Sequence, residues 1–132
     1  MNISASGMTA NRLRIDVISD NIANAETTRT PEGGPYKKKI PIFAEYIKRS
    51  LSGNKLAGVR VVRIEQDPSY KLVYDPTHPD ADKDGYVKMP NVNVLKEMVD
   101  LINAQRAYEA NVTSFNTVKS MINSALSIGR GV

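Results

Sequence analysis

The chain has 132 residues, of which 41% are hydrophobic and 24% charged, and its formal net charge is +4. This length predicts one domain, and the absence of tryptophan together with only two phenylalanines argues against a large aromatic core. Because there is no cysteine, disulfides, zinc fingers and thiol catalysis are excluded.

The first twenty residues do not resemble a secretory signal. Arg12, Arg14, Asp16 and Asp20 lie where such a signal requires an uncharged apolar run. No window of the chain approaches the roughly 20 apolar residues of a membrane-spanning helix. We therefore expect neither a cleaved signal peptide nor a membrane-spanning helix.

Residues 2–25 contain no proline and predict a helix with apolar residues on two faces. One face carries Met1, Met8, Ile15, Ile18, Ile22 and Ala25, and the nearly opposite face carries Ile3, Ala10, Leu13 and Val17. A helix on a monomer surface needs only one such stripe. The alternative, a fully buried core helix, is difficult to enclose in so short a chain.

The middle of the chain, up to Pro90, is interrupted by prolines and glycines that exclude long helices. Residues 58–64 and 70–74 are rich in β-branched or aromatic residues and predict strands, with residues 85–88 as a third candidate. Residues 40–56 are ambiguous, and a short helix over residues 42–51 is one interpretation. The middle thus reads as a small β-rich insert.

From Asn91 or Asn93, either of which can cap a helix, a helical pattern runs to Gly129. Two apolar seams follow this helix. The first consists of Met98, Leu101, Gln105, Tyr108, Val112, Phe115, Lys119, Ile122 and Leu126, and the second of Ala104, Ala107, Asn111, Ser114, Val118, Met121, Ala125, Ile128 and Val132. Two seams are typical of a helix packed between several neighbours, so we expect other chains to supply the missing partners.

The predicted fold class is therefore α+β. Residues 1–26 and 91–132 form long helices, arranged as a coiled-coil-like pair or as part of a multi-subunit helical tube. Residues 27–90 form an extended, β-rich insert between them.

Several short segments resemble the flagellar rod and hook proteins. Those of the N-terminal signature are residues 6–10 (SGMTA), 16–18 (DVI) and 21–24 (NIAN). Further segments look like the proximal rod members of that family, namely residues 27–36 (TTRTPEGGPY), 73–76 (VYDP), 78–82 (HPDAD), 85–87 (GYV) and 89–93 (MPNVN), and residues 105–111 (QRAYEAN) resemble its C-terminal helix. Residues 44–58 show no such resemblance.

The resemblance implies a structural subunit of the bacterial flagellar basal body, without enzymatic activity and without a cofactor. It would polymerise into a hollow, torque-transmitting rod that crosses the periplasm, with its terminal helices layered around an export channel. Expected partners are other copies of the chain, other rod proteins, the inner-membrane ring and an export-gate adaptor, and neither nucleic acid nor a small-molecule substrate. The family leaves the cell interior through the flagellar type III apparatus without signal cleavage.

Apolar and amide side chains of the two helices are the expected assembly interface. They are Met8, Leu13, Ile15, Val17, Ile18, Asn21, Ile22, Asn24, Met98, Leu101, Gln105, Tyr108, Asn111, Val112, Phe115, Val118, Met121, Ile122 and Leu126. Within this set the asparagines Asn21, Asn24 and Asn111 are expected to fix the alignment of helices, as a buried asparagine does in coiled coils. The alternative is that they lie on an ordinary exposed surface.

The acidic motif Asp80-x-Asp82-x-Asp84-Gly85 copies the first half of a calcium-binding EF-hand loop. Position twelve, however, is Asn91 instead of a glutamate, so a plain Asp-Gly turn is favoured. His78 is the only histidine and reads as a turn residue, and no GxxxxGK or HExxH motif occurs. No catalytic or metal-binding residue is therefore predicted.

Two features are left with alternatives. The lysines of residues 37–39 could attract nucleic acid, although a solvated or inter-subunit charge patch is favoured because few aromatic residues accompany them. Gly7 costs the first helix about 1 kcal/mol relative to alanine, which indicates either a frayed helix start or close approach of another segment. A calcium-responsive module and a nucleic-acid-binding protein thus remain as competing classes.

Overall fold

Two helices of unequal length dominate the structure, a computed structural model that describes residues 2–49 and 55–130. In chain order the elements are α1 (Asn2–Ala23), β1 (Lys39–Arg49), β2 (Lys55–Gln66), β3 (Tyr70–Tyr74), β4 (Tyr86–Pro90) and α2 (Val94–Arg130). The strands form two separate antiparallel hairpins, β1–β2 and β3–β4. The α+β fold class and both helices are confirmed.

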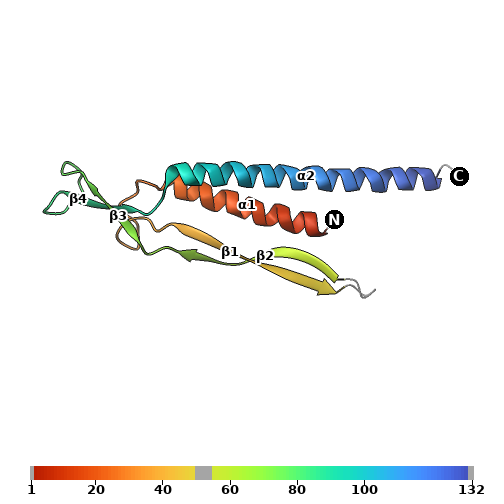
Figure 1. Cartoon of the computed structure of the whole chain (residues 1–132), viewed down its shortest axis with the longest axis horizontal. Coiled ribbons are helices and arrows are strands. Elements are labelled where there is room, and N and C mark those ends of the chain that lie inside the picture. The colour runs from red at the N-terminus through yellow and green to blue at the C-terminus, as the bar shows by residue number, and fades with distance from the viewer. Residues whose placement is uncertain (1, 50–54, 131–132) are drawn as a thin grey trace.

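Figure 1 shows α1 lying between α2 and the β1–β2 hairpin, with β3–β4 beyond the end at which α2 begins. The two helices run in opposite directions. Asn93 caps α2, because its Oδ1 accepts a hydrogen bond from the Lys96 N–H at 3.1 Å. Within the described ranges, neither helix has a stretch that is both long and apolar enough to cross a membrane.

The second apolar face of α1 finds its partner inside the chain. Ala10 and Val17 of that face are buried and Leu13 is half-buried. The Ser6 hydroxyl on the same side accepts a hydrogen bond from the Val59 N–H of β2 at 3.3 Å. Both faces of α1 are thus partly covered within the chain, yet Arg12, Asp16 and Asp20 stay exposed, so α1 is not a fully buried core helix.

The β1–β2 hairpin corrects the interpretation of residues 42–51 as a short helix. Residues 42–49 belong to β1, and the register runs from Lys39 opposite Gln66 to Arg49 opposite Lys55. Isoleucine, phenylalanine and tyrosine dominate β1 and favour an extended chain once a partner strand is present. That partner is distant in sequence, so local spacing alone could not reveal it.

One irregularity interrupts this hairpin. Ile42 pairs with Arg63 and Phe43 with Val61, so Val62 is an extra residue in β2. Such a bulge increases the local twist of a strand pair.

The β3–β4 hairpin confirms the strand predicted over residues 70–74 and the third candidate near residue 86. Tyr74 pairs with Tyr86, and their rings meet edge to face with centroids 5.4 Å apart. Gly85 precedes β4 with φ +86°, and a Cβ there would lie 2.9 Å from the Tyr74 ring. Glycine is therefore required at this turn on two grounds.

The hydrophobic core is small. Its buried apolar members, within the part of the chain that the structure describes, are Ala10, Val17, Ile18, Val87, Val92 and Ala104. The accessible surface is 9583 Å², whereas a compact monomer of this mass exposes about 6,900 Å². Met1, Leu51 and Val132, which entered the predicted helices, lie outside the described residues.

Candidate assembly surface and its internal clamp

The side of α2 that meets α1 combines residues from both predicted seams. Ala104 is buried, and Leu101, Tyr108, Asn111 and Phe115 are half-buried. A Cβ added to Gly7 of α1 would lie 3.1 Å from the side chain of Asn111, so this glycine allows close approach of the two helices. The contact line between the two helices therefore runs between the two predicted seams.

The last turns of α2 have no partner within the described chain. Every residue from 119 to 130 is exposed, and Figure 1 shows this segment continuing past the N-terminal end of α1. Met121 is 66% exposed, Leu126 56% and Ile128 72%. At 1.5 Å per residue the exposed segment is about 18 Å long.

The predicted interface residues fall into three groups by exposure. Three are buried inside the chain: Val17, Ile18 and Asn21. Eleven are half-buried: Met8, Leu13, Ile15, Ile22, Asn24, Leu101, Tyr108, Asn111, Val112, Phe115 and Val118. Five are exposed: Met98, Gln105, Met121, Ile122 and Leu126.

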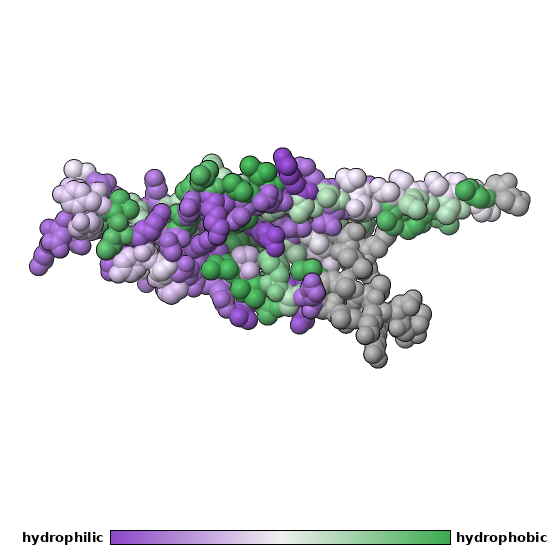
Figure 2. All heavy atoms as spheres, in the orientation of Figure 1, coloured by the Kyte–Doolittle hydropathy of each residue, from purple (hydrophilic) through white to green (hydrophobic). Residues whose placement is uncertain are grey.

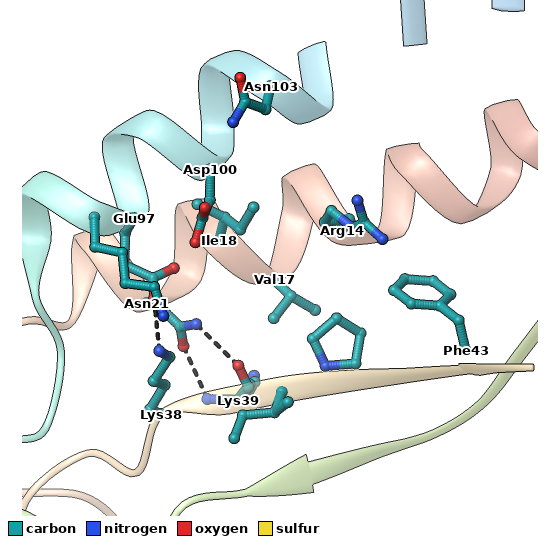
Figure 3. Close-up of a pocket in the computed structure, with 13 residues that line it drawn as sticks. Arg14, Val17, Ile18, Asn21, Lys38, Lys39, Phe43, Glu97, Asp100 and Asn103 are labelled. Carbon is teal, nitrogen blue, oxygen red and sulfur yellow. Dashed lines mark hydrogen bonds and ion pairs between the residues drawn. The ribbon is translucent and has the colours of Figure 1, made fainter. Parts of the chain in front are cut away.

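Asn21 is the centre of a polar clamp that holds the hairpin on the helices (Figure 3). Its Nδ2 donates to the Lys39 carbonyl at 2.9 Å, and its Oδ1 accepts from the Lys39 N–H at 2.9 Å. The same Oδ1 accepts from the Tyr36 hydroxyl at 2.8 Å. Asn21 is 1% exposed. Because its side chain bonds both the N–H and the carbonyl of Lys39, it pairs with the first residue of β1 as a neighbouring strand would.

A buried ion pair supports this clamp from α2. The Lys38 ammonium lies 3.0 Å from a Glu97 carboxylate oxygen, and the Glu97 side chain is only 3% exposed. Partial burial, together with the negative charges of Asp20 and Glu97, raises the pKa of Tyr36 to about 12. Tyr36 therefore keeps its proton and donates to Asn21 at any physiological pH.

Sequence reasoning missed most of this clamp. Lys38 pairs with Glu97, and Lys39 lies 3.4 Å from Asp20, so two of the three clustered lysines serve contacts within the chain. The favoured interpretation as a solvated or inter-subunit patch was therefore wrong for Lys38, whereas the pair of Lys39 with Asp20 is open to solvent. One clue was present in the sequence. Glu97 directly precedes Met98, the first residue of the first seam, and a charged residue beside an apolar seam indicates a charged partner.

The clamp borders an open cleft of about 550 Å³ between α1, β1 and α2. Figure 3 shows Arg14 and Phe43 at one end of it and the clamp at the other. The Arg14 guanidinium lies 5.0 Å from the centre of the Phe43 ring, a cation–π contact. Charged and apolar side chains both line the cleft, as they do where packed elements meet without filling the space between them.

Asn24 and Asn111 also bond within the chain. The Asn24 side chain donates to the Asp20 carbonyl at 2.9 Å and accepts from the Thr27 hydroxyl at 3.1 Å, which closes the turn after α1. The Asn111 side chain donates to the Ala107 carbonyl at 3.0 Å. Both remain half-buried.

The acidic motif forms the predicted turn. Asp82 Oδ1 accepts hydrogen bonds from the Asp84 and Tyr86 N–H groups, both at 2.9 Å. Asp80 accepts from Thr28 and Arg29, and these bonds hold its pKa below the usual value. Across residues 2–49 and 55–130, no group of histidine, aspartate and glutamate side chains is arranged to hold a metal ion.

His78 is confirmed as a turn residue. Its N–H donates to the Asp75 carbonyl at 3.1 Å, and its Nδ1 accepts from the Asp80 N–H at 3.0 Å. The ring thus stabilises the path of the acidic turn.

Two family models match the chain at its ends. Residues 1–29 match a model described as "Flagella basal body rod protein". Residues 83–128 match a model described as "Flagellar basal body rod FlgEFG protein C-terminal". These matches cover both helices and assign the chain to the class of flagellar basal-body rod proteins.

Comparison with curated proteins refines the class. The chain is 52% identical to the flagellar basal-body rod protein FlgC of Borreliella burgdorferi over 99% of its length and 96% of that protein. It is 46% identical to FlgC of Bacillus subtilis over 98% and 96% of the two chains. FlgC of Escherichia coli O157:H7 is 43% identical over 98% and 95%.

The chain belongs to the FlgC family of flagellar basal-body rod proteins. It is therefore a structural subunit of the flagellar basal body, which assembles with other rod components, and it is not an enzyme.

Proposed function

We propose that this rod subunit polymerises through its two terminal helices into a hollow, torque-transmitting shaft around an export channel. The observation that carries the proposal is the unburied surface. The chain exposes 9583 Å², about 2,700 Å² more than a compact monomer of its mass. Obligate interfaces bury about 2,000–5,000 Å² in total, about 1,000–2,500 Å² on each partner, so the excess is what one or two permanent neighbours would cover.

The proposed interface is the predicted set of helix residues, in two roles. Exposed members such as Met98, Met121 and Leu126 contact neighbouring subunits directly. Buried members such as Val17, Ile18 and Asn21 act indirectly, because they fix the shape of the surface that the neighbours meet. The half-buried members, including Asn24 and Asn111, become fully covered in the polymer and align the helices there.

The division into residues 1–26 with 91–132 and residues 27–90 also belongs to this proposal. The first pair of segments forms the assembly domain, and the middle is the insert that faces outward from it. The packing of β1–β2 along α1 gives the insert a second task, which is to support α1 while no neighbour is present.

The same proposal covers route and position. The subunit leaves the cell interior through the flagellar type III apparatus without signal cleavage and joins the part of the rod that crosses the periplasm. Its proximal neighbours are the inner-membrane ring and the export-gate adaptor. A chain with an unpartnered helix end unfolds at little cost, which suits passage through a narrow channel.

The test separates folding from assembly. A Met121→Ser, Leu126→Ser double variant should keep the circular dichroism and melting temperature of the purified monomer, because both side chains are already in water. It should fail to enter isolated basal bodies and to restore motility in cells that lack the wild-type chain.

Ser120→Ala with Ser127→Ala is the matched control, since it alters the polar side of the same turns and should assemble normally. Normal incorporation of the Met121, Leu126 variant would contradict the proposal.

A further inference from the structure

The charges of the chain are divided unequally along its sequence. Three segments, residues 1–15, 46–64 and 110–132, contain nine lysines and arginines and none of the fourteen acidic residues. The remaining residues contain nine cations and all fourteen acids, which gives them a net charge of −5. The formal net charge of +4 therefore hides one part that is cationic throughout.

The three acid-free segments lie at the same end of the fold, and together they are called the basic end. The start of α1 meets β2 where the Val59 N–H donates to the Ser6 hydroxyl at 3.3 Å, and Gly7 faces Asn111 of α2. Figure 1 shows the first turns of α1, the outer half of the β1–β2 hairpin and the last turns of α2 on this side of the molecule, away from β3–β4. Charges that are distant in sequence thus add to one local field.

The β1–β2 hairpin carries most of the cations of the basic end. Arg49 and Lys55 are directly opposite each other in the register, a like-charge pair that destabilises a sheet. Arg63, at the inner boundary, pairs with Glu65 at 2.6 Å, but no acidic residue occurs over residues 46–64. The counter-charge for the outer half of the hairpin is therefore expected from outside this end of the chain. The cations of the hairpin segment are Lys48, Arg49, Lys55, Arg60 and Arg63.

Exposed apolar side chains lie among these charges. Arg60 is exposed, and Val62 and Ile64 beyond it are 47% and 45% exposed. Figure 2 shows hydrophobic side chains over this hairpin with hydrophilic ones beside them. A surface that combines cations with apolar groups and lacks acids suits the headgroup region of an anionic bilayer, where the apolar side chains also leave water. The phosphates of a nucleic acid attract the cations equally but give the apolar side chains no such place.

We propose that the basic end docks on a bilayer surface rich in anionic phospholipid. The contact is peripheral and reversible, since it depends on exposed charges and few apolar groups. The same surface repels the acid-containing part, so the chain is oriented with β3–β4 away from the lipid. This inference goes beyond rod assembly, because it places the newly made subunit at the inner face of the membrane, where the proposed export route begins.

Flotation of the purified full chain with vesicles tests the docking. Vesicles of phosphatidylglycerol mixed equally with phosphatidylcholine should bind the chain at least about tenfold more tightly than vesicles of phosphatidylcholine alone. Each lysine or arginine at an anionic surface contributes about fivefold to binding. The triple variant Lys48→Gln, Lys55→Gln, Arg60→Gln should therefore weaken the binding at least about tenfold.

The matched control removes the same charge from the other part of the chain. The triple variant Lys37→Gln, Lys83→Gln, Lys88→Gln replaces side chains that are also exposed, and it should change the binding by less than about threefold. Circular dichroism of both variants checks that the fold is retained. Equal weakening by the two variants would show that net charge decides the binding, and would overturn the inference.

Salt provides a measurement on the unaltered chain. Raising sodium chloride from about 0.05 M to about 0.5 M shortens the Debye length severalfold, and should release the chain from the vesicles. Binding that persists at the higher concentration would contradict a contact driven by charge. These measurements use the monomer, so their failure would leave the proposed function of the assembled rod untouched.

Val62→Ser with Ile64→Ser tests the assignment to lipid. Both side chains are exposed in the monomer, and their loss should weaken binding to the anionic vesicles at least about threefold. Unchanged vesicle binding would overturn lipid as the partner. So would tighter binding of the wild-type chain to a short DNA duplex or to poly-L-glutamate than to the vesicles, which would indicate a nucleic acid or an acidic protein surface instead.

Discussion

The two parts of α2 share an apolar pattern but differ in their surroundings. In residues 94–118 α1 covers one side of the pattern, and Ala104 there is 1% exposed, although Met98 on another side is 49% exposed. In residues 119–130 the same spacing continues, yet Ile128 is 72% exposed. Helical periodicity therefore predicts that a face will be covered, but not whether its partner belongs to the same chain.

The covered part has a task that the open part lacks. Around Asn21 and Glu97, hydrogen bonds and an ion pair join α1, β1 and α2. This clamp fixes the relative positions of the helices and the hairpin before any neighbour arrives. Residues 119–130 need no such bonds, because they continue the helix of residues 94–118 and their position follows from it.

Proline in the covered region should have the largest effect. Ile18 is 6% exposed in the C-terminal half of α1, and proline inside a helix costs about 3 kcal/mol or more. Ile18→Pro should remove the folded α1–α2 pair and abolish incorporation into the rod, although the chain is still produced. Circular dichroism and a motility assay measure both effects, and normal motility would show that the covered region is dispensable.

Loss of the central amide should come next. Asn21→Ala leaves the Lys39 backbone groups and the Tyr36 hydroxyl without their partner, and unsatisfied buried groups should cost about 2–3 kcal/mol in total. Urea denaturation of the monomer gives this difference. A change no larger than that of Asn123→Ala, on the exposed end of α2, would mean that the clamp contributes little.

Neutralising the buried ion pair should have a smaller effect. Glu97→Gln should lower the free energy of unfolding by about 1–2 kcal/mol, less than for a fully buried pair because Lys38 keeps some contact with water. Glu65→Gln is the matched control, since its pair with Arg63 is exposed and is expected to contribute below about 0.5 kcal/mol. Equal effects of the two variants would remove the distinction between covered and open regions.

Alkaline pH should weaken the fold gradually. The pKa of Tyr36 is raised from 10.0 to about 12 in the folded chain, so the protonated form stabilises the fold fully below pH 10. This contribution is lost as the pH rises from about 10 to 12, where the unfolded chain ionises first. Tyr36→Phe should remove that part of the pH dependence, measured as the difference in unfolding free energy between the two chains at each pH.

Sequence alone predicted the elements with strong local signals. The helices begin and end within a few residues of expectation, because Asn93 is a cap and proline-free amphipathic runs are distinctive. Residues 70–74 are a strand, as predicted, because β-branched and aromatic residues cluster there. The acidic turn was also predicted, since Asp-Gly in a proline-rich segment has few other conformations.

What sequence missed depends on contacts between distant segments. Residues 42–49 have a spacing that fits a helix as well as a strand, and only pairing with β2 decides between them. Glu97 and Lys38 are 59 positions apart, so nothing local connects them. The interface residues remain a prediction, and exposure divides them into groups that periodicity could not separate.

The order of the elements along the chain determines when each contact can form. α1 is made first, yet its helical partner α2 is made last, and joining them closes a loop of some seventy residues. The β1–β2 hairpin is local and should form much sooner than this distant pairing. During synthesis it is therefore the hairpin that first shields α1 from water, and the helix pair is completed only after the whole chain has emerged.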